Sequence, residues 1–299
     1  MEGFAKIAKF ATIQIVLLAN KLRGELVVKK FLSIVIAIIL CVGLISCRVV
    51  KNNVKDEKVD LIVFAAASMT ETLSEIKTMY EKEHRDVSII YNFDSSGTLL
   101  KQILAGAECD VFISAAVKQM NSLDITCDES ANKDRNDFVL SDTRINLLEN
   151  KVALAVPDGN PKGIKSFDDI LTDKLSLLAI GNADVPVGAY TLEILESLGK
   201  PVAEFEKEGK VTYGSNVKEV TTQVKEGLVD AGIIYATDAF SAGLYTVDLA
   251  DASMCRQVIY PAAVLKTSKN RDVAKEYLDY LRSDVAMSVF EKVGFTRAE

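Results

Sequence analysis

Short apolar strands alternate with amphipathic helices along most of this 299-residue chain. Segment 61–64 is an apolar strand, and Met69, Leu73, Ile76 and Tyr80 then recur at helical spacing. The pattern repeats, and further strands are predicted at 87–93, 110–113, 151–156, 177–180, 211–213, 231–235 and 258–264. This alternation predicts an α/β fold with mixed, mostly parallel sheets flanked by helices.

The length allows about two domains. The last strand and two closing helices, near 272–281 and 284–293, are expected to return to the first domain. The prediction is therefore a first lobe from 59–149 plus 260–299 and a second lobe from 150–259. Such a chain crosses between its lobes near Asn150 and near Tyr260, which would create a hinge and a cleft.

Segment 31–47 is an apolar run without a charge, and Lys29 and Lys30 precede it. A basic start followed by an apolar run and small residues is typical of a secretory signal. The run ends in Leu-Ile-Ser-Cys, which resembles the bacterial lipobox, so Cys47 is expected to be acylated. Residues 1–46 would then be a signal region and 47–58 a polar tether, with an uncleaved signal anchor as the alternative.

The residues before Lys29 fit a signal sequence poorly. The segment 23–25, Arg-Gly-Glu, is what a purine-rich ribosome-binding site gives when it is translated in frame. We therefore expect that translation starts at Val27 or Val28, so that the residues of 1–27 before that start do not belong to the protein.

Net charge limits the class of partner. The whole chain carries −7, and residues 1–46 hold six basic and two acidic residues, so a chain starting at Cys47 carries −11. An acidic protein without a basic stripe is a poor nucleic-acid binder. Any anion must be bound by local donors rather than by the overall field.

Three cysteines lie beyond Cys47, namely Cys109, Cys127 and Cys255. Cys127 and Cys255 both fall in polar stretches, so a disulfide between them and free thiols are both open. No C-x-x-C or metal-ligand spacing occurs, and no metal or cofactor is expected.

Catalysis is not expected. The single histidine, His84, lies at the polar end of the first predicted helix, and neither G-x-S-x-G nor a phosphate-binding loop occurs. A serine nucleophile would therefore lack a base.

Four strand-to-helix turns, at 67–68, 95–97, 186–188 and 215–217, could form a binding site. Ligands of open α/β sheets bind at the carboxyl ends of strands, where helix starts expose free N–H groups. None of the four turns contains lysine, arginine or histidine, and neutral donors suit a fully ionised anion. The alternative is simple helix capping, by Ser68 in a capping box with Glu71 and by Asn216.

The segments LIVFAAASMTETLSEI, FDSSGTLLKQILAGAECDVFISA, GNADVPVGAYTLEILESLG, GIIYATDA and VIYPAAVLKTSKN resemble the molybdate-binding proteins of molybdate ABC transporters. The similarity extends over about 59–295. It implies the two-lobed periplasmic-binding-protein fold of type II, with a cleft that closes about a hinge.

The resemblance also implies a ligand set, carried over by motif to Ser68, Ser96, Val187, Val217 and Tyr235. The three hydroxyls and the backbone N–H groups of the first four would donate to molybdate or tungstate. Val187 stands where the family commonly has alanine, and a backbone donor tolerates that change.

The implied protein is a monomeric lipoprotein on the extracytoplasmic face of the cell membrane, with an ABC permease as its partner. A binder of another oxyanion, such as sulfate or phosphate, is the main alternative, and a sensor or adhesion lipoprotein is a second. Segment 125–136 is expected to be an inserted polar loop.

Overall fold

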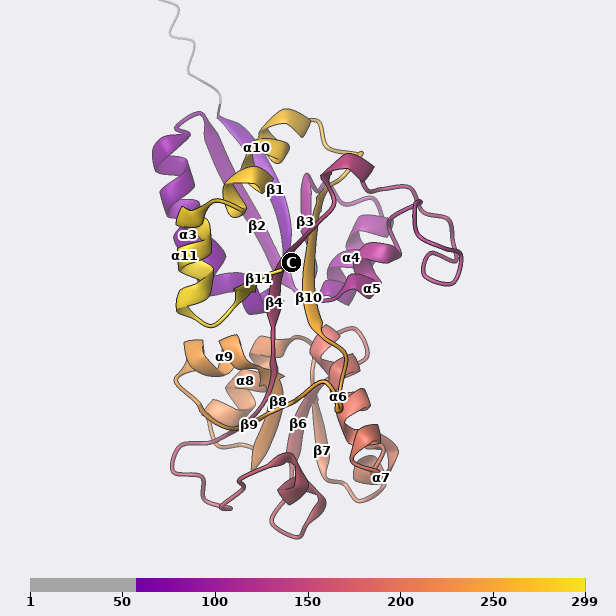
Figure 1. The fold of residues 1–299 in the computed structure, drawn as a ribbon, viewed down its shortest axis with the longest axis vertical. Coiled ribbons are helices and arrows are strands. Elements are labelled where there is room, and N and C mark those ends of the chain that lie inside the picture. The colour runs from indigo at the N-terminus through magenta and orange to yellow at the C-terminus, as the bar shows by residue number, and fades with distance from the viewer. Residues whose placement is uncertain (1–57, 299) are drawn as a thin grey trace, which may run out of the picture. The chain divides into compact units, whose positions relative to one another are not determined.

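The computed structural model describes residues 58–298, which belong to one compact unit (Figure 1). The predicted signal region, the acylated Cys47, the start at Val27 or Val28 and the tether up to residue 57 lie outside the described residues. Within 58–298, no helix has the length and apolarity that a membrane span requires.

Lobe I is defined here by a six-stranded sheet in the order β11-β4-β10-β3-β1-β2. Its strands are β1 (Val59–Ala66), β2 (Val87–Asp94), β3 (Val111–Ile113), β4 (Ile145–Asn150), β10 (Val258–Val264) and β11 (Thr296–Arg297). Its helices are η1 (Ala67–Met69), α3 (Thr70–Glu83), α4 (Ser96–Leu104), α5 (Val117–Asn121), η2 (Ser141–Thr143), α10 (Arg271–Leu281) and α11 (Asp284–Lys292).

Lobe II is defined by a five-stranded sheet in the order β7-β6-β8-β5-β9. Its strands are β5 (Val152–Val156), β6 (Leu178–Gly181), β7 (Val211–Gly214), β8 (Ala231–Tyr235) and β9 (Tyr245–Leu249). Its helices are η3 (Phe167–Leu171), α6 (Pro186–Ser197), α7 (Val202–Lys207), α8 (Val217–Lys225) and α9 (Ala236–Ala242).

The two-lobed α/β class is confirmed, and both sheets are mixed. Parallel pairing joins β1 to β2 and β3, and β6 to β7 and β8. The antiparallel share is larger than the sequence pattern suggested, since β4, β5, β9, β10 and β11 all pair antiparallel. The parallel strands are those connected by helices, as parallel pairing requires long crossovers.

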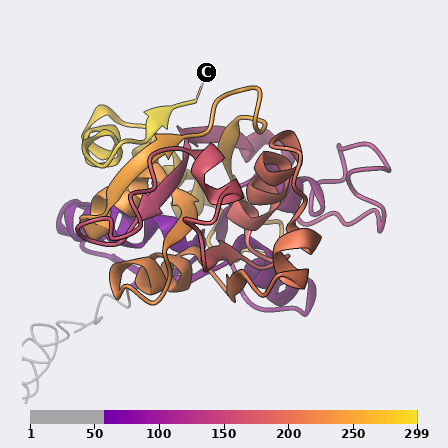
Figure 2. The ribbon, with the colours of Figure 1, turned by 90° about the horizontal axis from the view of Figure 1, so that it is seen from below.

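The chain passes between the sheets twice. Lys151 separates β4 from β5, and segment 250–257 leads from β9 back to β10. Strands β4 and β10 pair with each other, with Asn150 opposite Val258. The two crossings therefore lie side by side (Figure 1), and Figure 2 shows the same ribbon turned by 90° about the horizontal axis.

Each lobe has a helix whose apolar face is buried against its sheet. In lobe I, Leu73 and Ile76 of α3 are fully buried in the same core as Leu61 and Val63 of β1. Complete burial of such side chains stabilises the fold by about 1.5–3 kcal/mol each. These cores hold the helix starts in place.

One local expectation was wrong, and the structure decides one alternative that the sequence left open. Ser68 does not cap α3, because it lies in η1 and α3 begins at Thr70 without a side-chain cap. The disulfide alternative also fails, since Cys109, Cys127 and Cys255 are all free thiols. The polar segment 125–136 contains neither helix nor strand, as expected.

Candidate functional site

In lobe I, the start of α4 presents Ser96. The preceding Ser95 caps the helix, since its Oγ accepts from the N–H of Thr98 at 3.1 Å. Ser96 is fully buried, and its Oγ accepts from the N–H of Ala115 at 2.9 Å. Since that bond uses a lone pair of Ser96 Oγ, the hydroxyl proton remains for another acceptor.

The second serine of lobe I, Ser68, belongs to a polar chain that ends at the lobe crossing. Its Oγ lies 2.8 Å from the Oη of Tyr260, which accepts from Asn150 Nδ2 at 3.3 Å. Because Tyr260 accepts from Asn150, it can donate to Ser68, and the Ser68 proton is then available. Asn150 Nδ2 also donates to Thr237 of lobe II at 2.9 Å.

In lobe II, two helix starts present backbone rather than side chains. Val187 is the second residue of α6, behind Pro186, and Val217 is the first residue of α8. The predicted cap at Asn216 is confirmed, since its Oδ1 accepts from the N–H of Glu219 at 3.1 Å. Both valines are buried, which leaves their N–H groups as their polar contribution.

The backbone N–H groups of four predicted site residues lack an acceptor within the described part of the chain. These residues are Ser68, Ser96, Val187 and Val217. All four are buried, with at most 5% of their surface exposed. Every helix start leaves its first N–H groups without an intrahelical acceptor, and such groups can donate to a bound anion.

Tyr235, the last residue of β8, supplies a hydroxyl from lobe II. It is buried, and its Oη donates to the carbonyl oxygen of Ala115 in lobe I at 3.4 Å. Burial raises the pKa of Tyr235 well above its usual value, and the neighbouring Tyr260 and Tyr190 add to the shift. The hydroxyl therefore keeps its proton at neutral pH and can act as a donor.

The predicted residues are brought together in a connected arrangement. Ser96 and Tyr235 bind the two ends of one residue, Ala115. Ser68 reaches Tyr235 through Tyr260, whose ring lies 5.8 Å from that of Tyr235.

The helix starts also approach one another across the lobes. Helix α8, which begins at Val217, packs on η1, which holds Ser68. Next to Ser96, the N–H of Gly97 donates at 3.0 Å to the carbonyl oxygen of Asp184, just before α6. Val187, the second residue of α6, therefore lies close to this contact between the lobes.

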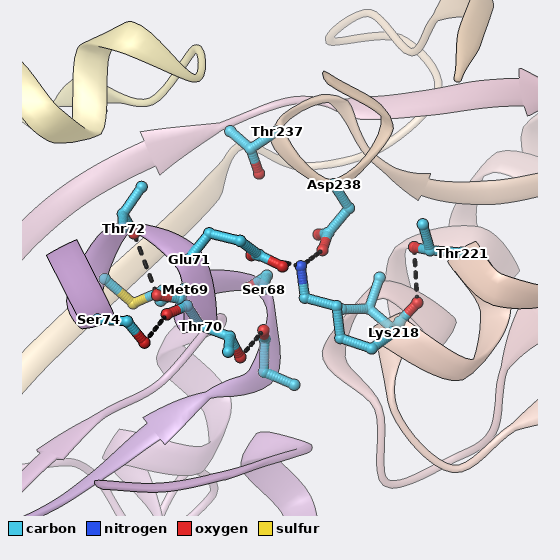
Figure 3. Close-up of polar contacts among 12 residues, drawn as sticks. Ser68, Met69, Thr70, Glu71, Thr72, Ser74, Lys218, Thr221, Thr237 and Asp238 are labelled. Carbon is cyan, nitrogen blue, oxygen red and sulfur yellow. Dashed lines mark hydrogen bonds and ion pairs between the residues drawn. The ribbon is translucent and has the colours of Figure 1, made fainter. Parts of the chain in front are cut away.

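Two charged contacts also join the lobes. Lys101 Nζ of α4 lies 2.6 Å from Asp184 Oδ2. Lys218 Nζ of α8 lies 2.6 Å from Glu71 Oε2 of α3 and 2.9 Å from Asp238 Oδ1 of α9 (Figure 3). Each of these lysines is paired with a carboxylate, so neither offers a free charge to a ligand.

Sequence analysis missed several of these residues. Asp184, Lys218 and Asp238 lie within or beside the quoted motifs, but their roles depend on how the lobes meet. Tyr260 and Asn150 were predicted only as crossing points. Within residues 58–298, no group of His, Cys, Asp or Glu side chains has an arrangement suited to a metal ion.

Comparison with known proteins defines the class. Residues 61–296 match the sequence profile of a protein family that is described as "Bacterial extracellular solute-binding protein". The chain therefore belongs to this family, and the predicted periplasmic-binding-protein fold is confirmed.

Among its relatives is the putative ABC transporter substrate-binding lipoprotein YvgL of Bacillus subtilis, 36% identical over 89% of this chain and 96% of that protein. The molybdate-binding protein ModA of Escherichia coli is 34% identical over 84% of this chain and 94% of its own length.

A solved structure, the substrate-binding domain of a putative molybdenum ABC transporter from Clostridium difficile, superposes with a TM-score of 0.60 at 33% identity. The superposition includes 81% of this chain and all of the solved domain. The resemblance to molybdate-binding proteins that the motifs predicted is confirmed by these similarities.

Proposed function

We propose that this protein binds molybdate, and equally tungstate, between its lobes and delivers it to an ABC permease. One observation carries the proposal: on four buried residues at helix starts, two from each lobe, the backbone N–H makes no hydrogen bond to a backbone acceptor among the described residues. The similarity to ModA proteins supports molybdate as the ligand.

The donor set suits a dianion that only accepts hydrogen bonds. Hydroxyls of Ser68, Ser96 and Tyr235 would donate beside the N–H groups of Ser68, Ser96, Val187 and Val217. Hydrogen bonds to a charged group contribute about 1.5–3 kcal/mol each. Several together can offset the dehydration of the anion, and the low-dielectric surroundings strengthen each bond.

The same donors explain the expected selectivity. Sulfate has the charge and shape of molybdate but is smaller, so a site sized for molybdate gives it longer and weaker contacts. Phosphate often carries a proton at neutral pH and would present a donor to a set of donors. Tungstate matches molybdate in charge and size and should bind as well.

Thermal unfolding of the full-length protein in mild detergent tests the ligand. We expect molybdate and tungstate to stabilise it strongly, by about 2.7 kcal/mol at one hundred times the dissociation constant. Sulfate and phosphate should have little effect. Preferential stabilisation by sulfate or phosphate would show that this oxyanion, and not molybdate, is the ligand. No stabilisation by any of the four anions would refute the proposal that the protein binds an oxyanion.

The cellular location is part of the proposal. The protein would be held at the extracytoplasmic face by acylated Cys47, as the lipoprotein name of the B. subtilis relative suggests. Replacing Cys47 by serine should release the protein from the membrane fraction without changing anion binding. Continued membrane retention of this variant would refute the lipid anchor while leaving the binding proposal intact.

A further inference from the structure

Lys218 is the second residue of α8, next to the proposed donor Val217, and it bridges the lobes. Its ammonium lies 2.6 Å from Glu71 Oε2 in lobe I and 2.9 Å from Asp238 Oδ1 in lobe II (Figure 3). One cation thus ties the first turn of α8 to the first turn of α3. Helix α8 also packs on η1, which holds Ser68.

Asp238 fixes the position of this lysine. The Asp238 side chain is fully buried, and the ion pair is the only polar contact of its carboxylate among the described residues. A buried carboxylate that loses its partner is strongly destabilising. Lys218 is therefore held in place by its own lobe.

The contact between Lys101 and Asp184 lacks such support. The side chains of Lys101 and Asp184 are 65% and 39% exposed, against 28% for Lys218 and 51% for Glu71, so the two pairs differ mainly in the lysine. Exposed ion pairs contribute little, partly because two long side chains must be ordered. For Lys218 that ordering is already achieved by Asp238, so more of the attraction to Glu71 is available to hold the lobes together.

We propose that Lys218 is a positioning residue of the anion site, which holds the start of α8 against lobe I through Glu71 and slows release of the bound anion. This inference rests on the proposed function. The anion leaves only after the lobes separate, and separation breaks the contact between Lys218 and Glu71. Loss of the Glu71 charge should therefore raise the dissociation rate and leave the association rate nearly unchanged.

The principal experiment measures release of bound molybdate from the full-length protein after a chase with excess tungstate. Glu71→Gln should release molybdate about two- to fivefold faster at low salt, the effect of an ion pair of this kind. Glu71→Asp should restore slow release, at least in part. The difference between Glu71→Gln and the unmodified protein should shrink at 1 M salt, where exposed charges are screened.

The matched control is Glu108→Gln, which removes an exposed ion pair between Glu108 and Lys269, both in lobe I. Its release rate should equal that of the unmodified protein. A double variant, Lys218→Met with Asp238→Asn, removes the bridge without leaving an unpaired buried charge and should release molybdate as fast as Glu71→Gln. Equal release rates for the unmodified protein and Glu71→Gln would overturn the inference, as would equal acceleration in Glu108→Gln.

Amide hydrogen exchange of the anion-free protein separates this inference from the proposed function. Glu71→Gln should speed exchange in the first turns of α3 and α8 and leave α10 unchanged. If none of the four oxyanions binds, the proposed function fails and the exchange comparison alone decides the role of the bridge. Unchanged exchange in both first turns would overturn it.

Discussion

The N–H of Gly97 donates a hydrogen bond to the carbonyl oxygen of Asp184 at 3.0 Å, and the two residues come from different lobes. The approach is so close that a Cβ added to Gly97 would lie 2.4 Å from that oxygen and 2.8 Å from the Asp184 Cα. Only glycine allows this contact, because both opposing atoms belong to the backbone and cannot rotate away.

Gly97→Ala should therefore keep the lobes apart. Overpacking of this kind costs about 1–3 kcal/mol, so the affinity for molybdate should fall about ten- to a hundredfold in calorimetric titration. As a control, Lys101→Ala removes only the exposed ion pair to the same Asp184 and should change the affinity less than about fivefold.

Ser96→Ala should weaken both binding and folding. It removes a proposed hydroxyl donor to the anion and the acceptor of the Ala115 N–H, and each loss costs about 1–3 kcal/mol. Calorimetry should show the loss of affinity and urea unfolding the loss of stability. Ser95→Ala removes the helix cap and the hydrogen bond between Ser95 Oγ and Thr98 Oγ1, both local to the start of α4, so it should cost about 1 kcal/mol of stability and no affinity. Equal affinities for Ser96→Ala and Ser95→Ala would exclude Ser96 from the site.

Tyr235→Phe should weaken binding with little effect on folding. The hydroxyl donates a long, 3.4 Å bond to the carbonyl oxygen of Ala115, but it would donate to a charged ligand, worth about 1.5–3 kcal/mol. We expect an affinity loss of about ten- to a hundredfold by titration. Tyr80→Phe is the control, because the buried Tyr80 hydroxyl has no partner among the described residues; its affinity should not change.

Asp238→Asn should flatten the dependence of stability on pH. Burial raises the pKa of Asp238 from 3.8 to about 6, although Lys218 partly opposes the shift. Between about pH 4 and pH 6 the folded protein therefore binds more protons than the unfolded chain, so the free energy of unfolding falls as pH rises. The contribution lost between pH 4 and pH 7 is about 2–3 kcal/mol.

Urea unfolding of the unmodified protein and Asp238→Asn at each pH measures this difference. The other titratable groups around Asp238 are Lys218, Glu71, Tyr235 and Tyr260. All four remain in the variant, so subtraction of the two profiles isolates Asp238 to first order. Parallel profiles for the two proteins would contradict the raised pKa.

Chemical modification of the cysteines should show that Cys127 and Cys255 do not form a disulfide. Burial raises the pKa of both Cys109 and Cys255, but Cys109 is buried whereas Cys127 and Cys255 are partly exposed. A thiol reagent at pH 8 should modify Cys127 and Cys255 in the folded protein, and Cys109 only after unfolding. Intact mass under non-reducing conditions should show no loss of two hydrogens; a cross-linked Cys127–Cys255 peptide would contradict the structure.

Local patterns predicted most helix starts and strands. Asn216 was predicted as a cap and is one, because capping depends on neighbours three residues away. The capping box of Ser68 and Glu71 failed, although its spacing is ideal. Both side chains have stronger tertiary partners, Tyr260 and Lys218, which lie far along the chain.

The contacts between lobes could not be predicted from local patterns. Whether Gly97 meets Asp184, or Lys218 meets Glu71, depends on how one sheet is placed against the other. The sequence around Gly97 gave no indication of this contact. Glycine is required there because of Asp184, which lies 87 residues away, and not because of the backbone angles of Gly97 itself. The five proposed ligand residues came from the family resemblance instead.

Asn150 has a further consequence for how binding is communicated. It is the last residue of β4, one position before the crossing, and its amide donates to Thr237 in one lobe and to Tyr260 in the other. Tyr260 in turn orients the Ser68 hydroxyl. A movement of lobe II relative to lobe I would therefore act on the Asn150 amide, and through Tyr260 on the hydroxyl of the proposed anion donor Ser68.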